Sequence, residues 1–310
     1  MTRICVIALL VSLLFAFSRG VQAQMDVALV NIHSTTVRSA LHSSIELSAP
    51  ITQKLHMLNS FLLVEAEIDG TPGLFVLDSG APGLILNRPS SSIDPAEDLY
   101  AEGVSGRVAV GTEHIKEFAW GPLHMQSFEA YSVDLNYLTA TLGKRVAGVI
   151  GYDQLRRLPF TLDFVAQRVN FHPTGYSADR PQLTFRMNMR GHLPTVRSRI
   201  DGRRLRLAID TGAGVNLLDD KQLRKLNTRA HKPLEEMMLR GLNAEYTRVP
   251  RSMVHLTEIE DANWIGLPFA FLDLQSVSDE GASFQGVLGR EWLQSHIVTF
   301  DYQQRRLYVQ

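Results

Sequence analysis

The sequence predicts a mainly β protein built from two related lobes, and three observations support that fold class. The 310-residue chain is 45% hydrophobic, and its apolar residues fall mostly in short runs separated by glycine or proline, which is typical of strands. A unit of sequence occurs twice. The stretch from His172 to Pro181 is dense in turn residues, as a linker would be. A helical period appears only near residues 221–226 and 233–240.

Each copy of the repeat opens with an alternating strand that stops at an Asp-Gly pair, VEAEIDG at 64–70 and VRSRIDG at 196–202. This pattern predicts a strand that enters a tight turn. An aspartate then follows in LDSGA at 77–81 and in IDTGA at 209–213, and an apolar strand comes after each. Asp210 lies 132 residues after Asp78.

A second block repeats as well. GVIG at 148–151 matches GVLG at 286–289, and both continue into short helix-like segments that end at Leu155 and Leu293. The predicted organisation is a signal segment at 1–23, an N-terminal extension at 24–57, lobe 1 at 58–172, a linker at 173–181 and lobe 2 at 182–310. The extension could be a mobile arm, an added strand or a propeptide-like segment.

The two aspartates are the predicted catalytic residues. A single Asp-Ser/Thr-Gly triplet usually marks a turn, but here both triplets follow an apolar strand at the same place in a repeated unit. Burying a carboxylate without a partner is costly, and two facing lobes let Asp78 and Asp210 lie side by side. Two such carboxyls share one proton and titrate as a pair, so one can activate water while the other donates a proton.

The residues next to each aspartate have predicted supporting roles. Gly80 and Gly212 would let the two loops approach where a Cβ atom would collide. Ser79 and Thr211 would offer hydroxyl groups that tie the loops together across the axis between the lobes.

The triplets at 78–80 and 210–212, each followed by a hydrophobic-hydrophobic-Gly element ending at Gly151 or Gly289, resemble the pepsin and retropepsin group of aspartic peptidases. The resemblance covers the chain from about Phe61. It implies an acid-protease-like fold in which each lobe is a closed, barrel-like β unit and the Gly151 and Gly289 elements complete a ψ-shaped catalytic loop. The chain resembles pepsin in carrying both aspartates, whereas each lobe is similar to the retropepsin-like domains of bacterial exported proteins.

Two features depart from pepsin-like enzymes. Ala81 and Ala213 stand where those enzymes have serine or threonine bonded to the carboxylate, so we expect a less acidic working pH than pepsin's. A hairpin with a tyrosine covers the cleft in that family. The candidates for it here are residues 100–106, which start at Tyr100, and residues 240–243.

The first 23 residues predict an export signal. Arg3 precedes an apolar run at 4–17, and residues 21–23 place small side chains where signal peptidase acts, so cleavage is expected before Gln24. The run is shorter than the ~20 apolar residues of a membrane span, so no stable membrane anchor is expected afterwards. The only cysteine, Cys5, lies inside the signal. The signal predicts an exported protein, periplasmic or secreted, and we expect a bacterial origin, with which the lack of an Asn-x-Ser/Thr sequon is consistent.

The predicted function is therefore an aspartic endopeptidase with a polypeptide substrate. Without residues 1–23 the chain has 29 basic and 32 acidic side chains, a net charge of −3, and this gives no reason to expect a nucleic-acid partner. The histidines form no His-Glu-x-x-His motif, so neither a metal nor another cofactor is expected. One alternative is a catalytically silent peptide-binding protein with the same fold. A second alternative is a dimer in which each aspartate pair forms between two chains, and a third is a glycosidase. We expect a monomer.

Overall fold

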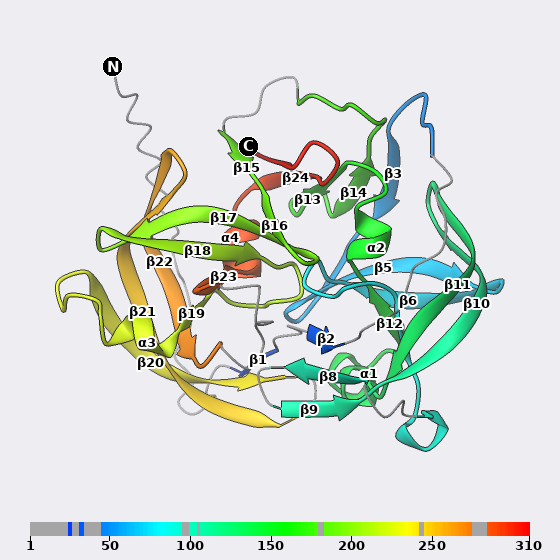
Figure 1. Ribbon diagram of the computed structural model, residues 1–310, viewed down its shortest axis with the longest axis horizontal. Coiled ribbons are helices and arrows are strands. Elements are labelled where there is room, and N and C mark those ends of the chain that lie inside the picture. The colour runs from blue at the N-terminus through cyan, green and yellow to red at the C-terminus, as the bar shows by residue number, and fades with distance from the viewer. Residues whose placement is uncertain are drawn as a thin grey trace.

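The computed structural model describes residues 24–26, 31–33, 45–94, 99–103, 106–178, 183–241, 245–274 and 284–310. The described elements are mainly strands, which form two lobes and a sheet that joins them (Figure 1). The mainly β, two-lobed fold predicted from the sequence is confirmed.

The strands of lobe 1 close into a ring. Their order is β10-β11-β7-β12-β6-β5, and β5 pairs back to β10. The ring strands and the attached β4 are β4 (His56–Leu58), β5 (Phe61–Ile68), β6 (Thr71–Leu77), β7 (Ile85–Asn87), β10 (Gly111–Trp120), β11 (Leu123–Val133) and β12 (Val146–Ile150).

Lobe 2 repeats this ring in the order β21-β22-β19-β23-β18-β17, with β17 pairing back to β21. Both lobes are thus the closed β units that the sequence predicted. The strands of lobe 2 are β16 (Asn188–Arg190), β17 (Leu193–Ile200), β18 (Arg203–Ile209), β19 (Leu217–Asp219), β20 (His231–Arg240), β21 (Tyr246–Ile259), β22 (Ala262–Leu272) and β23 (Gly286–Leu288).

The Asp-Gly pairs form the predicted tight turns. Asp69 and Gly70 have φ of 49° and 74°, and Asp201 and Gly202 have φ of 52° and 70°. Glycine and aspartate tolerate this left-handed region, which two-residue hairpin turns require at both central positions. Because the same turn sets the same register in both lobes, it places each aspartate loop at the same point of its ring.

A six-stranded sheet joins the lobes, and its centre marks the axis that relates them. Its order is β15-β25-β24-β13-β14-β3. Thr161 pairs with Thr299 at the middle of the sheet, and their hydroxyl oxygens are 2.7 Å apart. The strands are β3 (Ile51–Lys54), β13 (Phe160–Asp163), β14 (Arg168–Phe171), β15 (Leu183–Arg186), β24 (Ile297–Asp301) and β25 (Arg306–Val309).

The repeat extends upstream of the predicted boundary at residue 58. Strands β3 and β4 precede β5 just as β15 and β16 precede β17, and each pair takes corresponding places in the sheets. In the predicted linker, residues 173–178 form no helix or strand, and residues 179–181 lie outside the described part of the chain.

The helices are short. They are α1 (Asn136–Leu142), α2 (Tyr152–Leu155), α3 (Asp220–Leu223) and α4 (Arg290–Leu293), with a 3-10 turn at Ser90–Ser92. The helix-like segments before Leu155 and Leu293 are confirmed as α2 and α4. The helical period at 233–240 was misleading, because that segment lies in β20 and pairs with β21 along most of its length; cross-strand pairing outweighs local helix propensity there. None of the described helices is long and apolar enough to cross a membrane.

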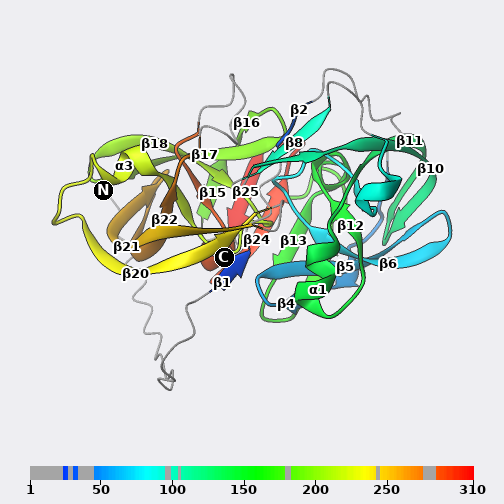
Figure 2. The same cartoon turned by 90° about the horizontal axis from the view of Figure 1, so that it is seen from below.

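Two strands from the N-terminal extension lie between the lobes in both ribbon views (Figures 1 and 2). Strand β1 (Gln24–Asp26) pairs in parallel with β20 of lobe 2. Strand β2 (Asn31–His33) pairs antiparallel with β8 (Tyr100–Gly103), which forms a hairpin with β9 (Gly106–Ala109). Strands β1 and β2 therefore add one strand to each lobe.

The largest hydrophobic core runs through both lobes and under the joining sheet. Trp120 and Trp292 are 1% and 0% exposed within it, and Phe160 stacks on Phe300 with ring centroids 5.1 Å apart. A smaller cluster in each lobe packs around its aspartate loop and includes Ala81 in lobe 1 and Ala213 in lobe 2. The aspartate loops thus stand on rigid, buried supports.

Candidate active site

Each aspartate follows directly on a buried strand of its ring. Asp78 comes after β6 and Asp210 after β18, and their backbone N–H groups donate to the carbonyls of Ile150 and Leu288 at 3.0 Å. In both lobes the strand that carries this carbonyl lies between the aspartate strand and the next one along the chain. This is the ψ-shaped arrangement that the resemblance implied, and it holds both aspartates at strand ends.

The two carboxyl groups meet at the interface of the lobes. Asp78 and Asp210 are both 0% exposed, and each carboxyl adjoins the loop that carries the other, next to Gly212 and Gly80 respectively. Gly80 N–H donates to Asp78 Oδ1 at 2.7 Å, and Gly212 N–H donates to Asp210 Oδ1 at 2.8 Å. Among the described residues, neither Oδ2 atom has a hydrogen-bond partner. Each carboxyl therefore has one buried oxygen that is still able to take part in a further hydrogen bond.

Burial raises the pKa of both aspartates. Loss of solvent raises the pKa of Asp78 well above its usual range, and the charge of Asp210 raises it further. Burial also raises the pKa of Asp210, but hydrogen bonds from Asp78 and from the Gly212 and Gly80 N–H groups oppose that rise. The pair therefore holds one shared proton at pH values where an exposed aspartate has lost its own.

Glycine is required where each loop meets the opposite carboxyl. A Cβ atom on Gly212 would lie 2.3 Å from Asp78 Cγ, and one on Gly80 would lie 2.7 Å from Asp210 Oδ2. Both distances are far below van der Waals contact, so the predicted close approach at these glycines is present.

Ser79 and Thr211 tie the two loops together in a reciprocal way. Ser79 N–H donates to Thr211 Oγ1 at 2.8 Å, and Thr211 N–H donates to Ser79 Oγ at 3.0 Å. Each hydroxyl then donates to a carbonyl of the opposite lobe, Ser79 to Ile209 and Thr211 to Leu77. The four bonds fix the relative position of the two aspartates.

Gly151 and Gly289 pack beneath the loops, as the motif suggested. A Cβ atom on Gly151 would lie 2.6 Å from the carbonyl oxygen of Ala81, and one on Gly289 would lie 2.6 Å from that of Ala213. The residue after each glycine donates its N–H to the same carbonyl, at 2.8 Å in lobe 1 and 2.7 Å in lobe 2. All of the predicted supporting residues therefore lie in the two aspartate loops or pack directly against them.

His192 is a neighbour of this site that the motifs did not indicate. Its Nε2 lies 2.8 Å from the carbonyl oxygen of Gly80, in the opposite lobe. Because a carbonyl only accepts, the ring donates from Nε2. His192 corresponds to Ser60 in the other copy of the repeat. The two residues are 132 positions apart, and each directly precedes the first ring strand of its lobe. The repeat thus identifies the corresponding position, but no sequence motif indicates that the His192 side chain contacts Gly80.

Both predicted flap segments form hairpins, whose tips at 104–105 and 242–244 lie outside the described residues. Tyr100 is half-buried in β8, and the guanidinium of Arg107 lies 4.3 Å from the centre of its ring. Arg240, at the end of β20, reaches lobe 1, where it donates to Thr141 Oγ1 at 2.5 Å and lies over the Tyr137 ring at 5.2 Å. The lobe 2 hairpin thus contacts α1 across the interface of the lobes.

A match to a known protein family agrees with this geometry. The family model described as "Aspartyl protease" matches residues 64–154 and again 196–292, so each match covers one copy of the repeat. The solved structure of basic 7S globulin from soybean is similar in shape, with 12% sequence identity, a TM-score of 0.47 and coverage of 84% of this chain and 94% of that chain. No curated protein matches this chain in sequence. Among the described residues, no three metal-binding side chains come together.

Proposed function

Because the chain belongs to the aspartyl protease family, we propose that it is an aspartic endopeptidase in which Asp78 and Asp210 activate a water molecule. The observation that carries the proposal is the pair of buried, adjoining carboxyls, each with one oxygen bonded to a glycine N–H and the other without a partner among the described residues. A structural ion pair would have a cation at this position, whereas two carboxyls that share a proton suit general acid–base chemistry.

The reaction follows from the single shared proton. The ionised carboxyl takes a proton from water as the water oxygen attacks the scissile carbonyl carbon, and the protonated carboxyl gives its proton to the carbonyl oxygen. The resulting gem-diol then collapses. One of its hydroxyl protons returns to a carboxylate, the other carboxyl protonates the amide nitrogen, and the C–N bond breaks to give an acid and an amine. Atoms and charges balance without a metal or an organic cofactor.

An extended polypeptide is the substrate that the surrounding strands suit. Strands β8 and β20 each accept an added strand from the N-terminal extension. Main-chain pairing of this kind supplies affinity for extended peptides, while pockets for alternate side chains supply specificity. The extension fills both of these strand edges, and the aspartates are inaccessible. These two features favour the second candidate, a catalytically silent peptide-binding protein.

Hydrolysis of a denatured protein between pH 3 and 8 tests the proposal. We expect cleavage that a pepstatin-type transition-state mimic inhibits. We expect the optimum to lie above about pH 3, because burial raises the pKa of both aspartates and the active singly protonated pair then persists to higher pH. If neither the chain from Gln24 nor one that begins at Ile45 cleaves at any of these pH values, the peptide-binding function is favoured instead. An optimum below about pH 3 would contradict the expected pKa shifts.

We also propose that the protein acts as an exported monomer. The signal-like segment at 1–23 supports export, and the presence of both aspartates in one chain supports a monomeric active enzyme. Sedimentation of the active enzyme distinguishes this state from a dimer whose sites form between chains.

The contact of His192 with Gly80 leads to a further prediction. Gly80 accepts from His192 through its carbonyl and donates to Asp78 through its N–H, so His192 holds the peptide that orients Asp78. We expect His192→Leu to lower kcat roughly tenfold with little change in KM, since an unsatisfied buried acceptor costs about 1–3 kcal/mol. His192→Gln should recover most of the loss because its amide can donate.

Steady-state kinetics of the two His192 variants checks this, with His255→Leu as a control at an exposed histidine. A purely structural role for His192 predicts lower stability and an unchanged kcat for the folded fraction. The positioning role is excluded if Gln restores no more activity than Leu, or if only KM changes.

A further inference from the structure

Four arginines lie on the outer face of lobe 2 in two directly opposed pairs. On strands β17 and β18, Arg197 is opposite Arg206 and Arg199 is opposite Arg204. Directly opposed side chains on neighbouring strands have Cβ atoms about 5 Å apart, and like charges at that distance destabilise the pairing. The opposed arginines therefore lower the stability of the folded protein, and their presence needs an explanation.

The fold does not require the arginines, because lobe 1 has the same strands without them. At the corresponding positions on β5 and β6, Glu65 is opposite Leu74 and Glu67 is opposite Pro72. The register is the same in both lobes, so the ring closes without opposed cations. The arginines are thus a property of lobe 2 alone.

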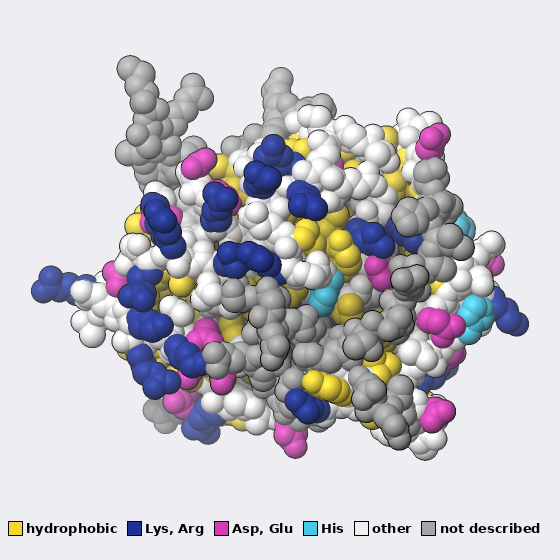
Figure 3. All heavy atoms as spheres, viewed as in Figure 1, with side chains coloured by type: hydrophobic (Ala, Val, Ile, Leu, Met, Phe, Trp, Pro, Cys, Tyr) yellow, Lys and Arg dark blue, Asp and Glu magenta, His cyan; other side chains and the backbone are white. Residues whose placement is uncertain are grey.

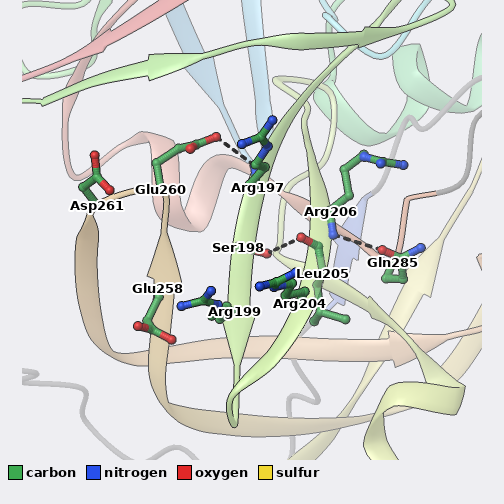
Figure 4. Close-up of a pocket in the computed structure, with 10 residues that line it drawn as sticks. All are labelled: Arg197, Ser198, Arg199, Arg204, Leu205, Arg206, Glu258, Glu260, Asp261 and Gln285. Atoms are coloured by element: carbon green, nitrogen blue, oxygen red, sulfur yellow. Dashed lines mark hydrogen bonds between the residues drawn. The ribbon is translucent and has the colours of Figure 1, made fainter.

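The arginines line a groove of about 740 Å³. Figure 4 shows them on two neighbouring strands, with three acidic side chains on the adjoining strand and its turn, namely Glu258, Glu260 and Asp261. Arg199 is opposite Glu258 across the strands, and Glu260 accepts the backbone N–H of Arg197 at 3.1 Å. One wall of the groove is therefore basic and the other acidic. Lysine and arginine side chains are also numerous over the lobe 2 side of the surface in Figure 3.

Three of the four arginines form no ion pair with the described acidic side chains. Within the described part of the chain, the ion pairs do not include the side chains of Arg197, Arg199 or Arg204. Burial lowers the pKa of Arg206, and the charges of Arg190 and Arg197 lower it further. An anionic group placed over β17 and β18 would relieve this repulsion.

We propose that this groove binds an acidic segment of an extended polypeptide, whose carboxylates contact the arginines of β17 and β18. Alternate side chains of a strand are about 6.7 Å apart, both along β17 and along an extended peptide, so glutamates at alternate positions match the arginine pairs. Guanidinium groups bind carboxylates in a bidentate way, and arginine clusters are a recurring means of recognising acidic peptides. A continuous anionic surface fits less well, because it would also face Glu258, Glu260 and Asp261.

Binding of a fluorescent peptide of alternating glutamate and alanine tests this, and needs no catalytic activity. We expect the wild-type chain to bind it, with affinity that falls as salt rises, and not to bind the glutamine version. Arg204→Glu together with Arg206→Glu should weaken binding at least tenfold. The same variant should unfold at a temperature no lower than the wild type, because each new glutamate is opposite an arginine of β17. Lys225→Glu with Arg229→Glu makes the same charge change outside the groove and should leave binding unchanged.

Several results would overturn the proposal. Equal binding by the groove and control variants would place the peptide elsewhere, and equal binding of the glutamine peptide would exclude recognition of charge. Binding of inorganic phosphate or of anionic phospholipid vesicles at least as tight as that of the peptide would assign the groove to phosphate groups. Loss of stability in the groove variant would make the arginines structural, and concentration-dependent self-association abolished by that variant would make the occupant a second copy of the chain.

Discussion

Asp78→Asn should abolish peptide hydrolysis and, at neutral pH, make the folded protein more stable. General acid–base groups contribute about 10²–10⁴-fold to rate, and removal of one member of a pair that shares a proton leaves no equivalent donor or base. Asp210→Asn should have the same effect on activity, because each carboxyl serves in both halves of the reaction. Rates of cleavage of a denatured protein by the two variants and the wild type measure this loss.

The gain in stability follows from the raised pKa of Asp78. Burial raises that pKa in the folded protein, whereas in the unfolded chain it is near 3.9. Between these two values the folded state binds a proton that the unfolded state has lost, so stability falls as pH rises through the folded pKa. Asparagine does not titrate. The stability difference between variant and wild type should therefore be small below about pH 3.9 and grow toward neutral pH.

Denaturant unfolding of wild type and Asp78→Asn from pH 3 to pH 7 provides the measurement, with Asp94→Asn as a control at an exposed aspartate. A variant that loses activity and stability together at neutral pH would show that Asp78 makes a structural contact. An Asp78→Asn variant that still cleaves the denatured protein would show that Asp78 is not a catalytic residue.

The aspartate pair could be predicted from the sequence because its signal was local and occurred twice. Each triplet follows an apolar strand at the same offset from an Asp-Gly turn, and the turn geometry is the same in both lobes. A repeat of this kind indicates spatial symmetry, and symmetry brings Asp78 and Asp210 together. The glycines and hydroxyl residues of the loops followed from the same argument.

The contacts that the sequence did not indicate are long-range and asymmetric. His192 contacts Gly80, and Arg240 contacts Thr141, in each case from the opposite lobe. The corresponding position in lobe 1 to His192 is Ser60, so comparison of the copies gives no chemical pattern to follow. The helical period at 233–240 was wrong for a related reason, since a partner strand distant in sequence decides the conformation of β20.

Inaccessibility of the aspartates bears on how substrate reaches them. Both are 0% exposed, and the N-terminal extension pairs with a hairpin strand of each lobe, β20 through residues 24–26 and β8 through residues 31–33. An extended substrate needs the same kind of strand edge. An extended substrate would therefore compete with the extension, and its apparent affinity would be reduced by the fraction of molecules in which the edges are open.

A chain that begins at Ile45 should therefore cleave a denatured protein faster than one that begins at Gln24. Ile45 and Leu47 pack against the main core, so this truncation removes both added strands and leaves the packed residues in place. Each ~1.4 kcal/mol by which the strand pairing stabilises the closed state corresponds to a tenfold gain in kcat/KM. Ile32→Pro in the longer chain should act in the same direction to a smaller extent, because proline removes a backbone donor from β2.

Steady-state rates of the two chains at equal concentration give the comparison, and the truncated chain with Asp78→Asn should be inactive. A thermal unfolding curve with a single cooperative transition shows that the truncated chain remains folded. Equal rates for the two chains would mean that the extension does not compete with substrate. A folded but inactive truncated chain would make β1 and β2 part of the substrate-binding surface, since the hairpins would then need their added strands to hold a peptide over Asp78 and Asp210.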